Sequence, residues 1–264
     1  MKSILAILVL TVAALWGAGA ALSGAPGAEK GFPIYDNMSY RGKPDTAKDG
    51  LIAATILYED KIWPNKQQLG ASPNRETFQA LVKAEASNPG PLVIDIESMS
   101  LRASPESARH NMETLAKLAD WAHEAVPGKV IGYYGTNTLS NVPAVNRTVA
   151  RELADHVDAF FTPIYTFDDS RASWERRAQA AQAEAHELDP KKPVYFFLWP
   201  QYHVGSGKAL RYVAAEYWKF QLETARHYSN GIVLWGPSQY VWDDKTGWWA
   251  ATKQFAASLH AEKK

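Results

Sequence analysis

Short apolar, strand-like runs alternate with helix-like stretches along this sequence, and that order limits the folds open to it. The expected strands cover residues 32–35, 51–58, 91–97, 129–134, 159–165, 193–198 and 232–235. The expected helices cover residues 75–87, 104–126, 145–157, 171–188, 208–228 and 248–260. Strands separated by helices form parallel sheets with the helices packed outside. For a chain of 264 residues we predict an α/β fold, a (β/α) TIM-type barrel that is distorted and has about seven strands, with an open doubly wound sheet as the alternative.

The first residues have the pattern of a secretory signal peptide. Lys2 supplies a positive charge, residues 4–16 are apolar, and Ala18-Gly19-Ala20 has the small residues of a cleavage site. We predict a signal peptide at residues 1–20, a linker at 21–30 and a single catalytic barrel domain at 31–264. An uncleaved membrane anchor is the alternative, although the apolar stretch is short for a span. The expected location is secreted or periplasmic, with no stable membrane anchor after cleavage.

The composition excludes several classes of chemistry. The chain has no cysteine, which rules out disulfides, thiolate catalysis and cysteine-ligated metals. Its formal net charge is zero, so no overall field favours nucleic acid or an anionic membrane as a partner. Gly205-Ser206-Gly207-Lys208 lacks the upstream glycine and the following Ser or Thr of a phosphate-binding loop. We expect no cofactor and no metal.

Two carboxylates end the apolar strand Pro91-Leu92-Val93-Ile94-Asp95-Ile96-Glu97. Side chains two residues apart on a strand point to the same face, so Asp95 and Glu97 should project together. Buried carboxylates are costly unless they are hydrogen-bonded or have a chemical task. The pair could also simply face solvent or an arginine. Its place at the carboxyl end of a central strand makes it the first candidate for an active site.

Carboxylates and aromatic rings also follow the other expected strands. The residues at or just after strand ends are Asp36, Tyr58, Glu59, Tyr133, Tyr134, Tyr165, Asp168, Asp169, Trp199, Tyr202 and Trp235. Tyr133 and Tyr134 alternate in direction, so only one of them can line a pocket. The histidines are scattered, and His203 is a lone histidine near a strand end. Acids and aromatic rings, without a nucleophilic-serine or paired-histidine motif, favour the chemistry of glycosidic bonds.

Seven segments, each at an expected strand, carry a resemblance to a known family. They are Phe32-Pro33-Ile34-Tyr35, Ile56-Leu57-Tyr58 with Trp63-Pro64, Val93-Ile94-Asp95-Ile96-Glu97, Gly132-Tyr133-Tyr134, Pro163-Ile164-Tyr165, Pro200-Gln201-Tyr202 and Gly231-Ile232-Val233-Leu234-Trp235-Gly236. In this order they resemble the hyaluronidase family of glycoside hydrolases, which has an Asp-x-Glu signature and a distorted barrel with fewer strands than usual. After Glu97 the sequence departs from that family: Ser98-Met99-Ser100 replaces another acid, an aromatic residue and Arg-Pro.

The resemblance implies a role for each matching residue. Glu97 would be the general acid and then the base, with its pKa raised by the neighbouring Asp95 carboxylate. Asp95 would orient the substrate's 2-acetamido group, whose carbonyl oxygen attacks the anomeric carbon, and Tyr165 would hydrogen-bond near that group. The candidate substrate-binding residues are Tyr202, Trp235, Tyr134, Tyr58 and Asp168. Trp235 could instead be barrel packing, and Asp168 could instead cap the helix expected at residues 171–188.

These inferences predict an exported glycoside hydrolase that cleaves an N-acetylhexosamine-containing polysaccharide with retention of configuration. Hyaluronan is one candidate substrate, for which Arg102 and Arg109 could supply local positive charge. A chitinase-like acid ladder would need a third carboxylate where Val93 stands. The alternatives are a non-catalytic glycan-binding or envelope protein on the same barrel, and a glycosidase with a conventional carboxylate nucleophile such as Asp36, Glu59 or Asp168.

Overall fold

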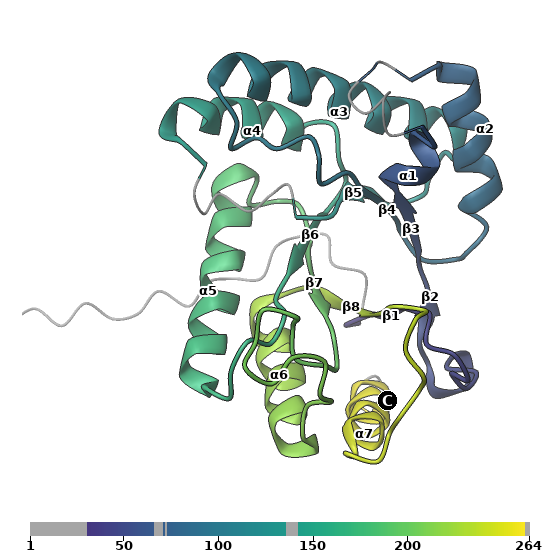
Figure 1. The fold of residues 1–264 in the computed structure, drawn as a ribbon, viewed down its shortest axis with the longest axis vertical. Helices are drawn as coiled ribbons and strands as arrows, with labels where there is room; N and C mark the ends of the chain where they lie inside the picture. The colour runs from purple at the N-terminus through teal and green to yellow at the C-terminus, as the bar shows by residue number, and fades with distance from the viewer. Residues whose placement is uncertain (1–30, 66–70, 72, 136–141, 262–264) are drawn as a thin grey trace, which may run out of the picture.

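The computed structural model of the chain describes residues 31–65, 71, 73–135 and 142–261 (Figure 1). The signal peptide and linker predicted for residues 1–30 lie outside the described residues. The strands are β1 (Ile34–Met38), β2 (Ile52–Ala53), β3 (Thr55–Tyr58), β4 (Leu92–Asp95), β5 (Ile131–Tyr133), β6 (Phe160–Pro163), β7 (Val194–Leu198) and β8 (Gly231–Gly236). The α-helices are α1 (Glu59–Ile62), α2 (Arg75–Glu85), α3 (Pro105–Ala125), α4 (Arg147–Ala154), α5 (Arg171–Leu188), α6 (Ala215–Tyr228) and α7 (Trp248–Ala261). Within these ranges, no helix is long and apolar enough to cross a membrane.

All the strand pairs are parallel, and the strands form two sheets. One has the order β2-β1-β8-β7-β6 and the other the order β3-β4-β5. The helices lie outside the strands, as an alternating order of elements predicts (Figure 1). The α/β barrel-type fold predicted from the sequence is therefore confirmed, with regular pairing broken at two places around the ring.

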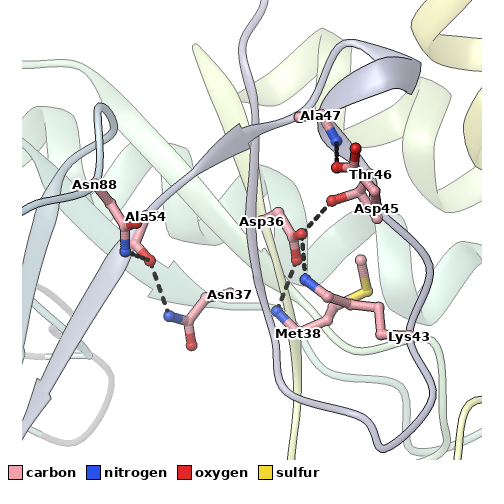
Figure 2. Close-up of polar contacts among 9 residues, drawn as sticks. All are labelled: Asp36, Asn37, Met38, Lys43, Asp45, Thr46, Ala47, Ala54 and Asn88. Carbon is pink, nitrogen blue, oxygen red and sulfur yellow. Dashed lines mark hydrogen bonds and ion pairs between the residues drawn. The ribbon is translucent and has the colours of Figure 1, made fainter.

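The first break falls inside a single run of chain. Only Ala54 separates β2 from β3, so the strand predicted for residues 51–58 is one strand that changes its partner. Ala54 donates its N–H to the carbonyl of Asp36 at 3.0 Å, and its own carbonyl accepts hydrogen bonds from the side-chain amides of Asn37 at 3.1 Å and Asn88 at 3.3 Å (Figure 2). These contacts tie β1 to the start of β4 across the break.

The second break lies between β5 and β6. A single bridge joins Tyr134 to Phe161, supported by a hydrogen bond of 2.9 Å from the N–H of Gly135 to the carbonyl of Phe161. Glycine is needed here for a close approach: a Cβ on Gly132 would lie 2.4 Å from the carbonyl oxygen of Ala159. The strands thus form a distorted ring, in which β2 pairs with β1 and β3, the continuation of the same strand, pairs with β4.

Alternate strand residues supply two apolar cores. One core fills the barrel and contains Tyr35, Ile56, Val93, Phe161, Phe197 and Val233. The other lies between strands and helices and contains Ile34, Leu57, Leu92, Ile94, Phe196 and Leu234, with many residues from the helices. Because the two faces of each strand are both apolar, the strands read as continuous hydrophobic runs in the sequence.

One predicted helix begins later than the sequence indicated. The expected helix at residues 208–228 starts at Ala215, and residues 208–214 form a loop. The Gln201 side chain donates to the carbonyl of Leu210 at 2.6 Å, and Gln201 also forms an antiparallel bridge with Tyr212. Leu210 has a φ of 66°, a left-handed conformation that a helix does not tolerate. The loop therefore folds back onto the residues that follow β7.

Candidate active site

A cavity of about 250 Å³ opens at the carboxyl ends of the strands, where barrel enzymes place their chemistry. Asp95 and Glu97 both line it, as predicted, although the strand expected to reach Glu97 ends at Asp95. The other lining residues are Ile56, Tyr134, Tyr165, Phe197, Trp199, His203, Val204, Trp235, Pro237, Gln239 and Tyr240. The cavity is therefore a mainly aromatic chamber with two carboxyl groups in its wall.

Asp95 is the deeper of the two acids. It is the last residue of β4, and its Oδ1 is buried without a hydrogen-bond partner among the described residues. Burial first, and then repulsion from Glu97 and Glu59, raises the pKa of Asp95 to about 7. Glu97 lies two residues beyond and is exposed at the lip of the cavity. Burial is the main cause of the raised pKa of Asp95, which the sequence alone does not predict.

The structure distinguishes the two adjacent tyrosines. The Tyr133 hydroxyl donates to the carbonyl of Leu115 in α3 at 2.6 Å, so this ring packs outward between sheet and helix. Tyr134 points into the barrel, lines the cavity and shares a side-chain hydrogen bond with Tyr165. Burial raises the pKa of both Tyr134 and Tyr165, so their hydroxyls stay neutral at ordinary pH. The cavity therefore offers phenolic hydrogen-bond groups beside the carboxyl pair.

Aromatic rings from three strand ends form the other wall. Trp235 contacts Trp199 edge-on with centroids 5.0 Å apart, and it lies 6.0 Å from Tyr165 at a tilt of 35°. The ring of His203 stacks on Tyr165 at 5.9 Å. Aromatic ring faces of this kind can pack against the apolar C–H face of a sugar ring.

Tyr58 stands beside this wall rather than in the cavity lining. It ends β3, is 37% exposed, and its hydroxyl accepts a hydrogen bond of 3.0 Å from the indole N–H of Trp235. Glu59, the next residue, accepts a hydrogen bond of 3.1 Å from the N–H of Ser98. Glu59 therefore holds the loop that leaves Glu97.

Tyr202 and Asp168, two further candidates, are placed outside the cavity lining. The Tyr202 hydroxyl bonds to the carboxylate of Asp169, which also pairs with Lys208. Asp168 accepts a hydrogen bond of 2.8 Å from the N–H of Ser170, next to the start of α5. Both side chains are thus occupied in shaping the loops around the site.

Asp36 is also occupied. Only 7% exposed, it accepts a 2.5 Å bond from the Lys43 ammonium group and a hydrogen bond from the Thr46 hydroxyl (Figure 2). Its other oxygen accepts a 2.8 Å bond from the N–H of Met38. This carboxylate lies on the face of β1 opposite the barrel interior and fixes the loop that follows the strand.

Several lining residues were not among the predicted site residues. For Trp199 and His203 the sequence indicates only a position near a strand end, and a lone histidine is weak evidence for a site. Gln239 and Tyr240 lie in the loop after β8, and nothing in the local sequence distinguished them. Among residues 31–261 as described, no group of three or more His, Asp or Glu side chains is arranged to hold a metal ion.

No family model and no curated protein sequence matches the chain, but solved structures match its fold. Bee venom hyaluronidase in complex with a hyaluronic acid tetramer gives a TM-score of 0.63 at 16% identity, with 87% of this chain and 96% of that chain covered. A monoclinic crystal structure of bee venom hyaluronidase gives 0.62 at 14% identity and the same coverage. A GH128 (subgroup I) endo-β-1,3-glucanase from Amycolatopsis mediterranei in complex with laminaritriose gives 0.50 at 13% identity, with 84% and 90% covered.

These likenesses confirm the resemblance to the hyaluronidases at the level of the fold. The similarity extends over most of both chains, and both matched proteins are glycoside hydrolases. The chain has the distorted barrel fold that is seen in bee venom hyaluronidase.

Proposed function

We propose that the protein is an exported glycoside hydrolase that cleaves an N-acetylhexosamine-containing polysaccharide with retention of configuration. The observation that carries this proposal is the pairing of Asp95 and Glu97 in one aromatic cavity at the carboxyl end of the barrel. Asp95 is the half-buried carboxyl, placed to orient a bound group, and Glu97 is the exposed one, placed to exchange a proton with a substrate in the cavity.

Each acid has a distinct task in the proposed reaction. Asp95 accepts a hydrogen bond from the N–H of the substrate's 2-acetamido group, and the carbonyl oxygen of that group attacks the anomeric carbon. Glu97 protonates the glycosidic oxygen as its bond to the anomeric carbon breaks. Water then attacks the same carbon, Glu97 takes back a proton, and the acetamido group is restored. The substrate supplies the nucleophile, so no second carboxylate nucleophile is needed.

The tyrosines and tryptophans support this chemistry in our proposal. Tyr165 and Tyr134 lie with the acids in the cavity wall, where their neutral hydroxyls can hydrogen-bond to the acetamido group or a neighbouring sugar oxygen. Trp235 and Trp199 present ring faces and edges to the sugar. A polysaccharide ligand also agrees with the solved neighbours, which were crystallised with a hyaluronic acid tetramer and with laminaritriose.

A conventional carboxylate nucleophile is the second candidate mechanism. Asp36 and Asp168 are engaged in local hydrogen bonds outside the cavity, which leaves Glu59, whose charge contributes to the raised pKa of Asp95. The likeness to an endo-β-1,3-glucanase favours this second mechanism, because a glucan has no acetamido group to act as the nucleophile. In that mechanism Glu59→Gln would abolish turnover, whereas in ours it weakens only the hold on the Ser98 loop.

A matched pair of substrates separates the two mechanisms. Reducing-end release is measured with the mature protein on chitin oligomers and on the same oligomers after de-N-acetylation, with hyaluronan, chondroitin, peptidoglycan and a neutral glucan alongside. We expect release only from N-acetylated substrates, because the carbonyl that attacks is part of the acetamido group. Efficient cleavage of the neutral glucan would refute acetamido assistance. Binding without cleavage of any glycan would favour a non-catalytic glycan-binding protein.

Export rests on the signal-peptide pattern of residues 1–20. Expression of the full chain in a bacterial host, followed by fractionation and mass determination of the N-terminus, tests it. A mature N-terminus near Ala20 in the periplasm or medium is expected, and an unprocessed chain in the membrane fraction would support the anchor instead.

A further inference from the structure

Behind the aromatic wall of the cavity, three side chains close a ring of buried hydrogen bonds. Trp199, which lines the cavity, donates its indole N–H to the side-chain oxygen of Gln201 at 3.0 Å and to the hydroxyl of Tyr40 at 2.9 Å. The Tyr40 hydroxyl donates in turn to the same Gln201 oxygen at 2.8 Å. All three residues are buried, and Gln201 is only 3% exposed. Because the ring is shielded from solvent, the indole depends on the other two side chains for its hydrogen bonds.

The direction of each hydrogen bond in this ring is fixed. An indole nitrogen can only donate, so Tyr40 and Gln201 both act as its acceptors. Burial raises the pKa of Tyr40, so its hydroxyl keeps the proton that it donates to Gln201. The Gln201 amide nitrogen donates to the carbonyl of Leu210 at 2.6 Å, and a carbonyl can only accept. The Gln201 amide therefore cannot turn over without breaking its bonds to Trp199 and Leu210.

These hydrogen bonds hold the Trp199 ring more narrowly than packing does. The ring meets Trp235 and Tyr165 edge-on, with centroids 5.0 Å and 6.0 Å away. Contacts of this kind tolerate small shifts, because each pair of atoms contributes little. A hydrogen bond weakens steeply when its angle or length changes. Two acceptors on one N–H therefore set the orientation of the indole.

The ring of hydrogen bonds also decides what Trp199 can offer to a ligand. Its N–H is used inside the protein, and the N–H of Trp235 is used in the same way by Tyr58. The two tryptophans therefore present carbon atoms to a sugar, and the acids and tyrosines supply the polar contacts. A gap of about 0.5–1 Å already forfeits a quarter to a half of such a contact. A wall that binds through carbon atoms must be held at the correct distance.

The same hydrogen bonds reach the loop after β8. Tyr40 packs closely on Gly236, the last residue of β8, where an added Cβ would lie 2.3 Å from the Tyr40 ring. The next residue, Arg41, donates its backbone N–H to the carbonyl of Tyr240 at 3.0 Å, and Tyr240 lines the cavity. A displacement of Tyr40 would therefore disturb Tyr240 as well as Trp199.

We propose that Gln201 is a positioning residue for the sugar-binding wall, with Tyr40 as its partner. Gln201 lies behind the described lining of the cavity and holds Trp199 in the one orientation that a bound sugar ring requires. The orientation of Trp199 is independent of any activity. Its effect on sugar binding rests on the proposed function.

The indole N–H resonances test the positioning without a ligand. The resonance of Trp199 is assigned by its loss in Trp199→Phe. Gln201→Leu keeps an apolar side chain of similar size and should move this resonance upfield by more than any other indole resonance. Thr252→Val is the matched control, because Thr252 accepts a 2.8 Å hydrogen bond from another buried indole, that of Trp218 between α6 and α7. It should move the Trp218 resonance instead. A Trp199 resonance that Gln201→Leu leaves in place would overturn the proposal.

Calorimetry with a chitin hexamer, in a Glu97→Gln background, tests the effect on binding. Gln201→Leu should raise Kd about tenfold, and Tyr40→Phe, which removes one of the two acceptors, about threefold. Thr252→Val should leave Kd within about twofold, because neither Thr252 nor Trp218 lines the cavity. With the acid pair intact, the loss in Gln201→Leu should appear in KM, with kcat within about twofold of the wild-type value.

The outcomes separate this proposal from the proposed function. An equal rise of Kd in Thr252→Val would trace the change to lost stability and overturn the positioning role. A wild type that binds or cleaves N-acetylated glycans while Gln201→Leu binds them equally well would uphold the hydrolase and refute the role of Gln201. If the wild type binds no glycan, the proposed function fails, and the indole resonances alone decide whether Gln201 fixes Trp199.

Discussion

Trp235 and Tyr58 are joined across the mouth of the barrel by a hydrogen bond of 3.0 Å from the indole N–H to the phenolic oxygen. Tyr58 is the last residue of β3 and Trp235 the last but one of β8, and the two are 177 positions apart in the chain. Trp235 also packs on Trp199 and Tyr165, so the bond to Tyr58 fixes the remaining edge of a ring that lines the cavity. Tyr58 is thereby a positioning residue for the aromatic wall.

Tyr58→Phe removes this hydrogen bond and keeps the ring. We expect KM to rise severalfold with little change in kcat, because the indole is less well oriented for sugar binding but the acids are untouched. Stability should fall by about 0.5–1 kcal/mol, the lower part of the range for one hydrogen bond, since the group is partly exposed. A double-mutant cycle with Trp235→Phe, read by binding calorimetry, measures the coupling. Additive effects on binding would contradict the positioning role.

Asp95→Asn should change the pH dependence of stability. The folded pKa of Asp95 is raised from 3.8 to about 7, so the folded chain holds this proton more tightly than the unfolded chain. The resulting stabilisation is present at low pH and is lost as the pH rises through 7. Asparagine cannot ionise, so at pH 8.5 the variant should be more stable than the wild type by about 1–2 kcal/mol, after allowance for solvent screening.

Urea unfolding of both proteins at pH 5 and pH 8.5 measures this effect. Ionisations elsewhere in the chain cancel in the difference between the two proteins. The advantage of the variant should be larger at the higher pH, and a difference that does not depend on pH would mean that Asp95 is not the group with the raised pKa. The variant should also lose hydrolytic activity, since it cannot provide a carboxylate for the acetamido N–H.

Asp36→Ala should damage stability and spare the chemistry. The change leaves the Lys43 ammonium group and the Thr46 hydroxyl without their buried partner, for which we expect a loss of about 3–5 kcal/mol. The kcat of the folded fraction should stay within about twofold of the wild-type value, because Asp36 lies outside the cavity lining. Thermal unfolding together with active-site titration separates the two effects. A stable variant with abolished turnover would instead identify Asp36 as a catalytic nucleophile.

Tyr133→Phe and Tyr134→Phe form a matched pair at adjacent positions. The first removes a buried hydrogen bond to Leu115 and should cost about 1–2 kcal/mol of stability with no effect on kcat/KM. The second removes the hydroxyl that meets Tyr165 in the cavity and should lower kcat/KM about tenfold with a smaller change in stability. The two variants are compared by urea unfolding and by initial rates. If Tyr133→Phe lowered kcat/KM and Tyr134→Phe lowered only stability, the placement of Tyr134 in the site would be wrong.

The barrel and the acid pair could be predicted because they depend on local patterns. Alternating strand and helix segments imply parallel strands, and the period of a strand expected to reach Glu97 predicts that Asp95 and Glu97 project to the same side. The same period shows that Tyr133 and Tyr134 point opposite ways but not which points inward, since that depends on which face of β5 meets α3. The helix start at Ala215 was missed because the side chain of Gln201 organises residues 208–214 from outside the segment.

The roles of single acids at strand ends were less predictable. Asp36 and Glu59 are equivalent in the sequence, as polar residues after apolar strands. Their difference comes from loops: Lys43 and Thr46 fold back onto Asp36, whereas Ser98 is brought to Glu59 by the chain that leaves Glu97. Such contacts depend on the path of irregular segments, for which residue patterns carry little information.

The central claim is that Glu97 is the acid of a glycosidase, and the rate of reducing-end release by Glu97→Gln tests it most directly. Glutamine keeps the size and hydrogen-bonding shape of the side chain but cannot transfer a proton. On the N-acetylated glycan that the wild type cleaves, we predict a fall in kcat of at least about a hundredfold, the lower end for a general acid, with KM little changed. A variant that cleaves the same glycan at the wild-type rate would contradict the account.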